Sequence, residues 1–134
     1  MSNRDVVVVD ASVVASWLLP AEDIDIPNNI IERKELCAPL LFWAAMRNIL
    51  VVSERHERLS ANMFSEALAI LEALNVQLDS KPDGNRVAHL AKGHNLSVYD
   101  ALYVELAVRL QVPSLLTLDR KVSISARREG VDVP

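Results

Sequence analysis

The chain has 134 residues, of which 51% are hydrophobic and 24% charged, and its formal net charge is −4 at pH 7. These values fit one compact globular domain over residues 1–134 and exclude a disordered or low-complexity chain. No apolar run reaches the roughly 18 residues that a membrane helix needs. The acidic balance lacks the basic surplus typical of nucleic-acid-binding proteins, without excluding such binding.

The amino terminus and the cysteine content bear on location. The apolar run Val6–Val9 is short and lies between Asp5 and Asp10, which is unlike a secretory signal peptide. Cys37 is the only cysteine, so it cannot form an internal disulfide. We expect a cytoplasmic protein without membrane association, in which Cys37 is an inert core residue.

The first elements follow from short-range patterns. Val6–Val9 is continuously β-branched, which predicts a strand buried on both faces. A helix over Ala11–Leu19 follows and stops before Pro20. The next segments are predicted to be a loop over Ala21–Asn28 and a short helix over Asn29–Lys34.

Two long helices are predicted in the middle of the chain. Pro39 suits the first position of a helix. The positions that share one face of this helix are Leu41, Ala45, Asn48 and Val52. Ser60 can cap the second helix. The inward positions of the second helix are Phe64, Ala67, Leu68, Leu71 and Leu74.

The second half of the chain alternates strands and helices. The predicted elements are a strand over Val76–Leu78, a helix over Pro82–His94, a helix capped by Ser97 and running to about Arg109, a strand within Pro113–Leu118, a helix over Asp119–Arg128 and an edge strand over Val131–Val133. Such alternation predicts an α/β fold with a mostly parallel sheet and helices on both faces. Ligands of these folds bind beyond the carboxyl ends of the strands.

Three aspartates lie where that rule directs attention. Asp10 ends the first strand, Asp119 follows the strand that ends near Leu118, and Asp100 lies in the first turn of a helix. Carboxylates gathered at one edge repel each other, and a hard divalent cation such as Mg²⁺ or Mn²⁺ relieves that repulsion. Each aspartate alone has a simpler explanation, because Asp10 and Asp119 can be helix N-caps and Asp100 can favour the positive end of its helix.

Four ordered motifs resemble those of VapC-type PIN-domain proteins. They are residues 9–20 (VDASVVASWLLP), residues 38–50 with Pro39 and Asn48, residues 96–107 (LSVYDALYVELA) and residues 115–121 (LLTLDRK). The resemblance implies a three-layer α/β/α sandwich with a short, mostly parallel sheet. It also implies an Mg²⁺- or Mn²⁺-dependent endoribonuclease, a VapB-like antitoxin partner and a homodimer.

The resemblance also assigns roles by position. Asp10, Asp100 and Asp119 match the acidic, metal-binding residues of the family, while Ser12 and Thr117 match polar positions that help to hold metal, water or phosphate. Metal-assisted hydrolysis of RNA would leave a 5′-phosphate and a 3′-hydroxyl.

The chain departs from the family at Ala45. The family carries a glutamate six residues after the proline and three before the asparagine, and Pro39 and Asn48 place that position at Ala45. Neither Glu35 nor Glu54 can replace it, since Glu35 precedes the helix and Glu54 lies about two and a half turns further on. The alanine reflects either natural loss of activity or a deliberate change that disarms a toxin, and it predicts an impaired enzyme.

Three further polar residues are weaker candidates for the site. Arg120, Lys121 and Asn48 could contact phosphate, although ordinary solvated surface explains such residues equally well. No HExxH motif or cysteine cluster points to zinc.

One rival function is that of a degenerate, non-catalytic PIN protein that acts as a protein-binding module. Another is a phosphoaspartyl switch or phosphatase built on Asp10, but the second acid that such a site needs after the first strand is missing.

Overall fold

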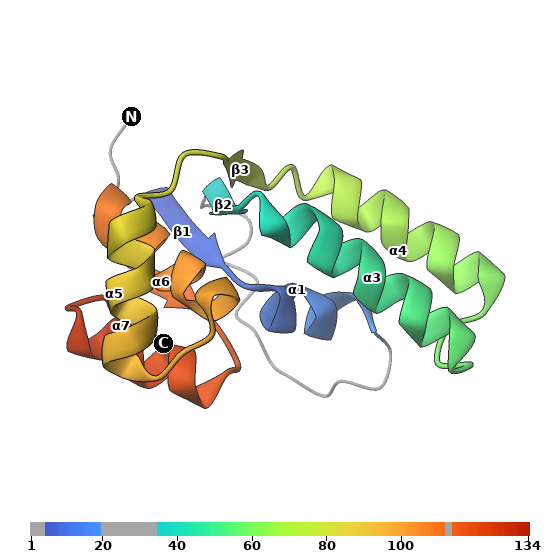
Figure 1. Ribbon diagram of the computed structural model, residues 1–134. Coiled ribbons are helices and arrows are strands. Elements are labelled where there is room, and N and C mark those ends of the chain that lie inside the picture. Colours follow the sequence, from blue (N-terminus) through green and yellow to red (C-terminus); the bar gives the residue numbers. More distant parts are fainter. Residues whose placement is uncertain (1–4, 20–34, 112–113) are drawn as a thin grey trace.

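A parallel sheet of four strands organises the computed structural model, which describes residues 5–19, 35–111 and 114–134 (Figure 1). The strands are β1 (Val6–Val9), β2 (Glu35–Pro39), β3 (Gln77–Asp79) and β4 (Ser114–Leu116). Their order in the sheet is β3-β2-β1-β4. The loop and short helix predicted for residues 21–34 lie outside the described residues.

The two middle strands explain the apolar runs in the sequence. Val8 pairs with Cys37 of β2 on one side and with Leu115 of β4 on the other. Val7, Val8 and Val9 are buried, as expected for a strand covered on both faces. Because all pairs are parallel, the carboxyl ends of the strands lie at one edge of the sheet.

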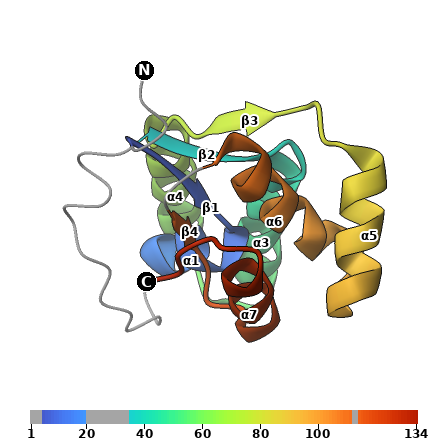
Figure 2. The same ribbon diagram turned by 90° about the vertical axis from the view of Figure 1, so that its left-hand side faces the viewer.

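Helices cover both faces of this sheet (Figures 1 and 2). They are α1 (Ala11–Leu18), α3 (Leu41–Arg55), α4 (Ala61–Ala73), α5 (Gly84–His94), α6 (Val98–Leu110) and α7 (Arg120–Arg128). The first three pack with one another, with α3 against β2. Helix α6 packs against β1, β2 and β4 and is flanked by α5 and α7. This arrangement confirms the predicted α/β/α sandwich.

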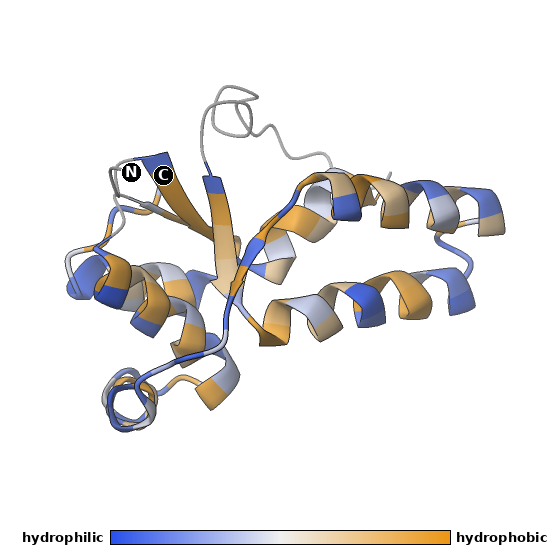
Figure 3. Ribbon diagram, turned by 90° about the horizontal axis from the view of Figure 1, so that it is seen from above, coloured by the Kyte–Doolittle hydropathy of each residue, from blue (hydrophilic) through white to orange (hydrophobic). Residues whose placement is uncertain are grey.

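The hydrophobic core lies along the strands and the inner helix faces. Figure 3 shows orange along the strands and in patches along the helices, and α3 and α4 extend away from the sheet as a helical hairpin. Met46 and Leu50 of α3 and Leu106 of α6 are among the fully buried side chains. Ala67 and Leu71 of α4 are buried, and the other predicted inward positions of α4 are partly buried against the core.

The sequence prediction missed β2 and misplaced Pro39. Pro39 is the last residue of β2, and α3 begins two residues later, at Leu41. Proline is compatible with this position because the pairing between β1 and β2 ends at Val8 and Cys37, so its missing N–H removes no bond from that pairing. The apolar residues before Pro39 pair between two strands instead of forming the approach to a helix.

The face of α3 that packs into the core differs from the set of positions that share a face with Ala45. The buried residues are Phe42, Met46, Leu50 and Ser53. The predicted set that contains Ala45 lies beside this face, and its members are half-buried or, at Asn48, exposed. Residues 131–133 form a single bridge, between Ser114 and Asp132, and not a full strand.

Most helix boundaries agree with the prediction to within two residues. Ser60, Ser97 and Asp119 are N-caps, as their side chains accept hydrogen bonds from backbone N–H groups of the first turn. In the described segments of the chain, none of the helices combines the length and the apolar character needed to span a bilayer.

Candidate active site

Asp10 is the most constrained acidic residue at the carboxyl edge of the sheet. It follows β1, and its side chain caps α1 by accepting from the backbone N–H of Val13 at 3.2 Å. The same oxygen, Oδ1, accepts from the Ser12 hydroxyl at 2.5 Å, and Oδ2 accepts from the Thr117 hydroxyl. The cap explanation considered for Asp10 is therefore correct, but the cap uses only part of its hydrogen-bonding capacity.

Burial sets the electrostatics of Asp10. The residue is 6% exposed, and this removal from water raises the pKa of its carboxyl above the ordinary value. The donors from Ser12, Thr117 and the backbone at Val13 oppose the shift because they stabilise the ionised form. A buried carboxylate held in this way gains from a nearby cation, which offsets the lost hydration.

Thr117 and Ser12 connect the end of β4 to the start of α1. Thr117 donates to Asp10 and accepts from the backbone N–H of Asp119 at 3.0 Å. Ser12 donates to Asp10 and accepts from the backbone N–H of Leu118 at 3.1 Å. The segment that precedes α7 is thus tied to Asp10 by two hydroxyl groups, which brings Asp119 to the same edge of the sheet.

Asp119 lies on the solvent side of this connection. It is exposed, and its Oδ1 caps α7 by accepting from the backbone N–H of Val122 at 3.1 Å. The cap explanation is correct here too. One carboxylate oxygen remains available to a ligand after capping.

Asp100 lies in the opening turn of α6. Its backbone N–H donates to the Ser97 cap, and its side chain is half-buried. Tyr103, one turn further along α6, is 5% exposed. Burial raises the pKa of the Tyr103 hydroxyl, and the negative charges of Asp10 and Asp100 raise it further. The two carboxylates therefore both act on one buried hydroxyl group.

The three aspartates do not form a metal site by themselves. Within residues 5–19, 35–111 and 114–134, no group of three or more acidic, histidine or cysteine side chains is placed so that it could hold a metal ion. The groups near Asp10 nevertheless offer only oxygen ligands. That donor set suits Mg²⁺ or Mn²⁺, which proteins often bind through one or two carboxylates with several waters retained.

Ala45 lies in the second turn of α3, whose start follows the carboxyl end of β2. β2 is next to β1 in the sheet, and α3 packs against α1, the helix that Asp10 caps. The methyl side chain of Ala45 provides no ligand atom. Because Ala45 is half-buried, water can reach this position. Asn48, one turn further on, is exposed.

The basic candidates are at the start of α7. Arg120 and Lys121 are exposed first-turn residues that directly follow Asp119. Neither makes an ion pair within the described residues. Their side chains are therefore available to an anionic ligand.

Sequence reasoning missed two groups. The spacing of Tyr99 and Tyr103 predicts that the two rings pack together and that one of them could line the site. The spacing of three between Asp100 and Tyr103 also places these two residues on neighbouring positions of α6. Glu105 was not considered, and it is 1% exposed. Its Oε1 accepts from Arg109 at 2.6 Å and from the backbone N–H of Asp83 at 3.2 Å, so its role is structural.

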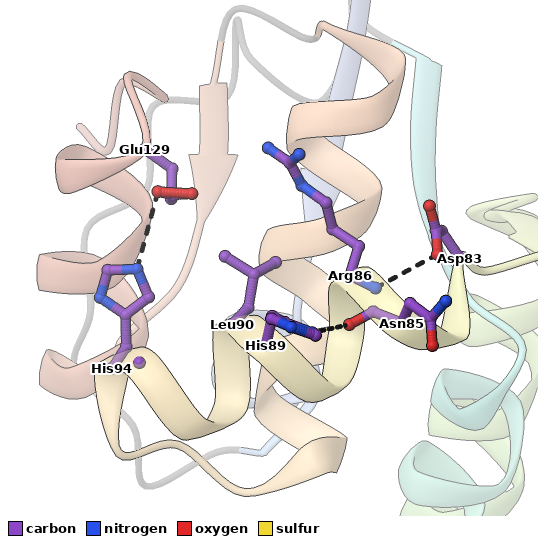
Figure 4. A pocket seen from close by; sticks show the side chains of 8 residues that line it. Asp83, Asn85, Arg86, His89, Leu90, His94 and Glu129 are labelled. Atoms are coloured by element: carbon purple, nitrogen blue, oxygen red, sulfur yellow. Dashed lines mark hydrogen bonds and ion pairs between the residues drawn. The ribbon is translucent and has the colours of Figure 1, made fainter.

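A hollow of about 560 Å³ lies elsewhere, along α5 and the end of α7. His94 Nε2 approaches Glu129 Oε2 at 3.7 Å on one side of it, and Arg86 points into it from α5 (Figure 4). None of the residues predicted to act lines this hollow. We therefore place the candidate site at the sheet edge, where the carboxylates are.

Comparisons with known proteins agree with the fold. A family model described as PIN domain matches residues 7–127. The structure is similar to the crystal structure of PAE2754 from Pyrobaculum aerophilum, with a TM-score of 0.73 and 23% sequence identity over 95% of this chain and 87% of that chain. At this identity the likeness concerns the fold. The search of curated proteins found no match.

Proposed function

The chain belongs to the PIN domain family, whose members are generally metal-dependent nucleases, and from that premise we propose that it is the endoribonuclease toxin of a VapBC-type pair. We further propose that Ala45 weakens or abolishes its activity. We also propose that the protein acts in the cytoplasm, where RNA substrates are found. Asp10, Asp100 and Asp119 are its acidic residues, with Ser12 and Thr117 in support.

One observation carries this proposal: Asp10 is buried at the sheet edge and held by two hydroxyl groups from different elements. Burying a carboxylate costs free energy, and a cap would serve equally well with an exposed side chain. The arrangement fits a ligand-binding role, because Oδ1 and Oδ2 are fixed in place before the ligand arrives.

In this proposal the three aspartates hold Mg²⁺ or Mn²⁺ through carboxylate oxygens. The ion would supply Lewis-acid activation of a water molecule and of a phosphate oxygen. Ser12 and Thr117 keep the Asp10 carboxylate in one orientation through their hydroxyl groups. Arg120 and Lys121, with Asn48 as a weaker candidate, bind the phosphates that flank the scissile bond.

The alanine at position 45 affects both binding and chemistry in this scheme. A missing carboxylate lowers the negative charge of the site and thereby its affinity for a divalent ion. It also removes a group able to orient or deprotonate the attacking water. The alanine does not reduce the stability of the fold, since one member of a repulsive group of acids is absent.

The direct test compares the chain with its Ala45→Glu variant on total RNA and on defined single-stranded RNA, with Mg²⁺, Mn²⁺ or a chelator. We expect the variant to cleave RNA at least tenfold faster, only with a divalent ion, and to leave 5′-phosphate ends. Ala45→Gln is the matched control, because it adds the same length without the charge, and it should stay as slow as the parent.

Equal cleavage by the chain and the Ala45→Glu variant would contradict the assigned role of position 45. Products that end in 2′,3′-cyclic phosphates would contradict the hydrolytic route, since metal-assisted attack by water yields a 3′-hydroxyl. Adding Asp10→Asn to the Ala45→Glu variant checks the site itself and should abolish cleavage.

The partner part of the proposal concerns the α3–α4–β3 surface. Trp43 and Leu78 are 52% and 37% exposed and line a hollow of about 200 Å³ beside Arg47. Exposed apolar groups of this kind mark protein interaction sites. We propose that a VapB-like antitoxin or a second copy of the chain covers them, which also fits the alternative that the chain is a non-catalytic binding module.

Oligomeric state and activity separate these options. If a second copy covers the surface, light scattering should show a dimer for the parent chain and a monomer for Trp43→Ser. Loss of antitoxin capture with an unchanged dimer assigns the surface to the antitoxin. A chain that stays inactive as Ala45→Glu but keeps its partner would favour the binding module.

A further inference from the structure

The two tyrosines of α6 have opposite environments. Tyr99 and Tyr103 are four residues apart, yet Tyr103 is 5% exposed and Tyr99 is 65% exposed. Within the described residues, Tyr99 makes no hydrogen bond and no ring contact. A large aromatic ring in water that has no packing role is available to a ligand.

Helix geometry relates Tyr99 to the candidate site. Residues four apart lie on one stripe of a helix, offset by about 40°. Side chains on α6 lean toward its amino-terminal end, where Asp100 lies. Tyr99 directly precedes Asp100 in the first turn of α6, and this helix packs against β1 and β4, so the ring lies at the same end of the helix as Asp100.

The exposed neighbours of Asp100 and Asp119 in the sequence include apolar and positively charged side chains. Val98 is 53% exposed beside Tyr99, and Leu118 is 46% exposed next to Asp119. Arg120 and Lys121 follow Asp119 and are exposed. Proteins that bind single-stranded nucleic acids use this combination, in which aromatic rings stack on bases while cations contact the backbone.

We propose that Tyr99 is a base-stacking residue for single-stranded RNA, holding a nucleotide next to the scissile phosphate at the rim of the site. This inference rests on the proposed nuclease function and adds a residue that selects for accessible bases, since the bases of a duplex are not free to stack on a protein ring. The apolar neighbour Val98 would contact the same nucleotide. Tyr99 is a specificity-determining residue here and has no part in the chemical step.

The test measures RNA affinity, so it does not require an active enzyme. A fluorescein-labelled single-stranded oligonucleotide is titrated with the Ala45 chain and with Tyr99→Phe, Tyr99→Leu and Ile70→Ala in Mg²⁺. Ile70 is 51% exposed on α4 and serves as the control for loss of an exposed apolar side chain. A second oligonucleotide has abasic sugars in place of all bases.

We expect Tyr99→Leu to weaken binding of the normal RNA about tenfold, and Tyr99→Phe and Ile70→Ala to leave it unchanged. The abasic RNA should bind the parent and Tyr99→Leu equally, because no base is left to stack. A 2-aminopurine base in the RNA should be quenched by the parent and less so by Tyr99→Leu.

Equal affinity of the parent and Tyr99→Leu for the normal RNA overturns the inference, as does an equal loss with the abasic RNA. If Tyr99→Leu instead impairs capture of a protein partner while RNA binding is unchanged, the ring belongs to a protein interface and the inference fails. Cleavage by Ala45→Glu is scored separately, so the nuclease proposal can stand when this inference fails. Absence of RNA binding by every form overturns the inference outright.

Discussion

Thr117 shows how one hydroxyl group can organise a site. It donates to Asp10 and accepts from the Asp119 N–H, so it fixes two proposed acidic residues relative to each other. A sequence shows Thr117 two residues before Asp119, but it does not show that the hydroxyl spans from the end of β4 to the end of β1. That contact joins residues 107 positions apart in the chain.

We predict that Thr117→Val lowers the free energy of unfolding by about 1 to 2 kcal/mol, because the Asp10 carboxylate loses a donor while it stays buried. Thr117→Ser is the matched control and should stay within about 0.5 kcal/mol of the parent. Urea unfolding in the presence of a chelator measures both. Equal stability of the valine and serine variants would show that the hydroxyl contributes nothing.

Cys37 provides a second prediction at the residue scale. Burial, together with the negative charges of Asp79 and Glu35, raises the pKa of its thiol from 9.0 to about 11. At pH 8 about one molecule in a thousand then carries the reactive thiolate. We expect iodoacetamide to label Cys37 in denaturant but not in the native protein at pH 8, as read by mass spectrometry.

The same shift has a consequence for stability. The folded state keeps the Cys37 proton to a higher pH than the unfolded chain does, so the unfolded chain binds fewer protons above pH 9.0. The contribution of this group is therefore fully present below pH 9.0 and is lost as the pH rises to about 11. Rapid native labelling at pH 8 would contradict both statements.

At the scale of elements, local signals predicted the helices better than the strands. Ser60 and Ser97 lie just before apolar repeats, and capping is a property of four or five neighbouring residues. Strand β2 has no comparable signal, because the apolar part of Glu35–Pro39 is short and ends in proline. Its place between β1 and β3 depends on pairing with residues distant in the chain.

One cluster of charges joins β3 to α6. Arg109 binds both oxygens of Asp79, at 3.2 and 2.6 Å, and also binds Glu105, which is fully buried. Residue spacing on α6 makes the Glu105–Arg109 pair foreseeable, but the contact with Asp79 requires the fold. The cluster fixes the helix that carries Asp100 and Tyr103 relative to the sheet.

We predict that Arg109→Leu costs about 3 kcal/mol in the free energy of unfolding, because it leaves the Glu105 carboxylate buried without its cation. The double variant Glu105→Met with Arg109→Leu should recover most of this loss, since no charge is then left buried. Chemical denaturation of the parent, the single variant and the double variant gives the comparison. A double variant as unstable as the single one would mean that packing, and not charge, explains the effect.

For the whole molecule, the sequence predicted the class of fold and the edge that carries the acidic residues. The alternation of strands and helices was sufficient to predict a sheet covered by helices on both faces. The rule for strand ends was sufficient to predict that Asp10 and Asp119 lie at the carboxyl edge of the sheet. The sequence could not distinguish the exposed Tyr99 from the buried Tyr103, because both are tyrosines on one stripe of the same helix. That difference arises only when α6 is packed against the sheet.

The central claim is that residues 10, 100 and 119 serve one cation at the carboxyl edge of the sheet. Paramagnetic broadening by substoichiometric Mn²⁺ in the NMR spectrum of the Ala45→Glu variant tests it most directly. We predict that the amide signals of residues 10–13, 100–103 and 117–122 broaden most strongly and together, and that Asp10→Asn removes the effect. Broadening centred on separate surfaces, or unchanged by Asp10→Asn, would contradict the account.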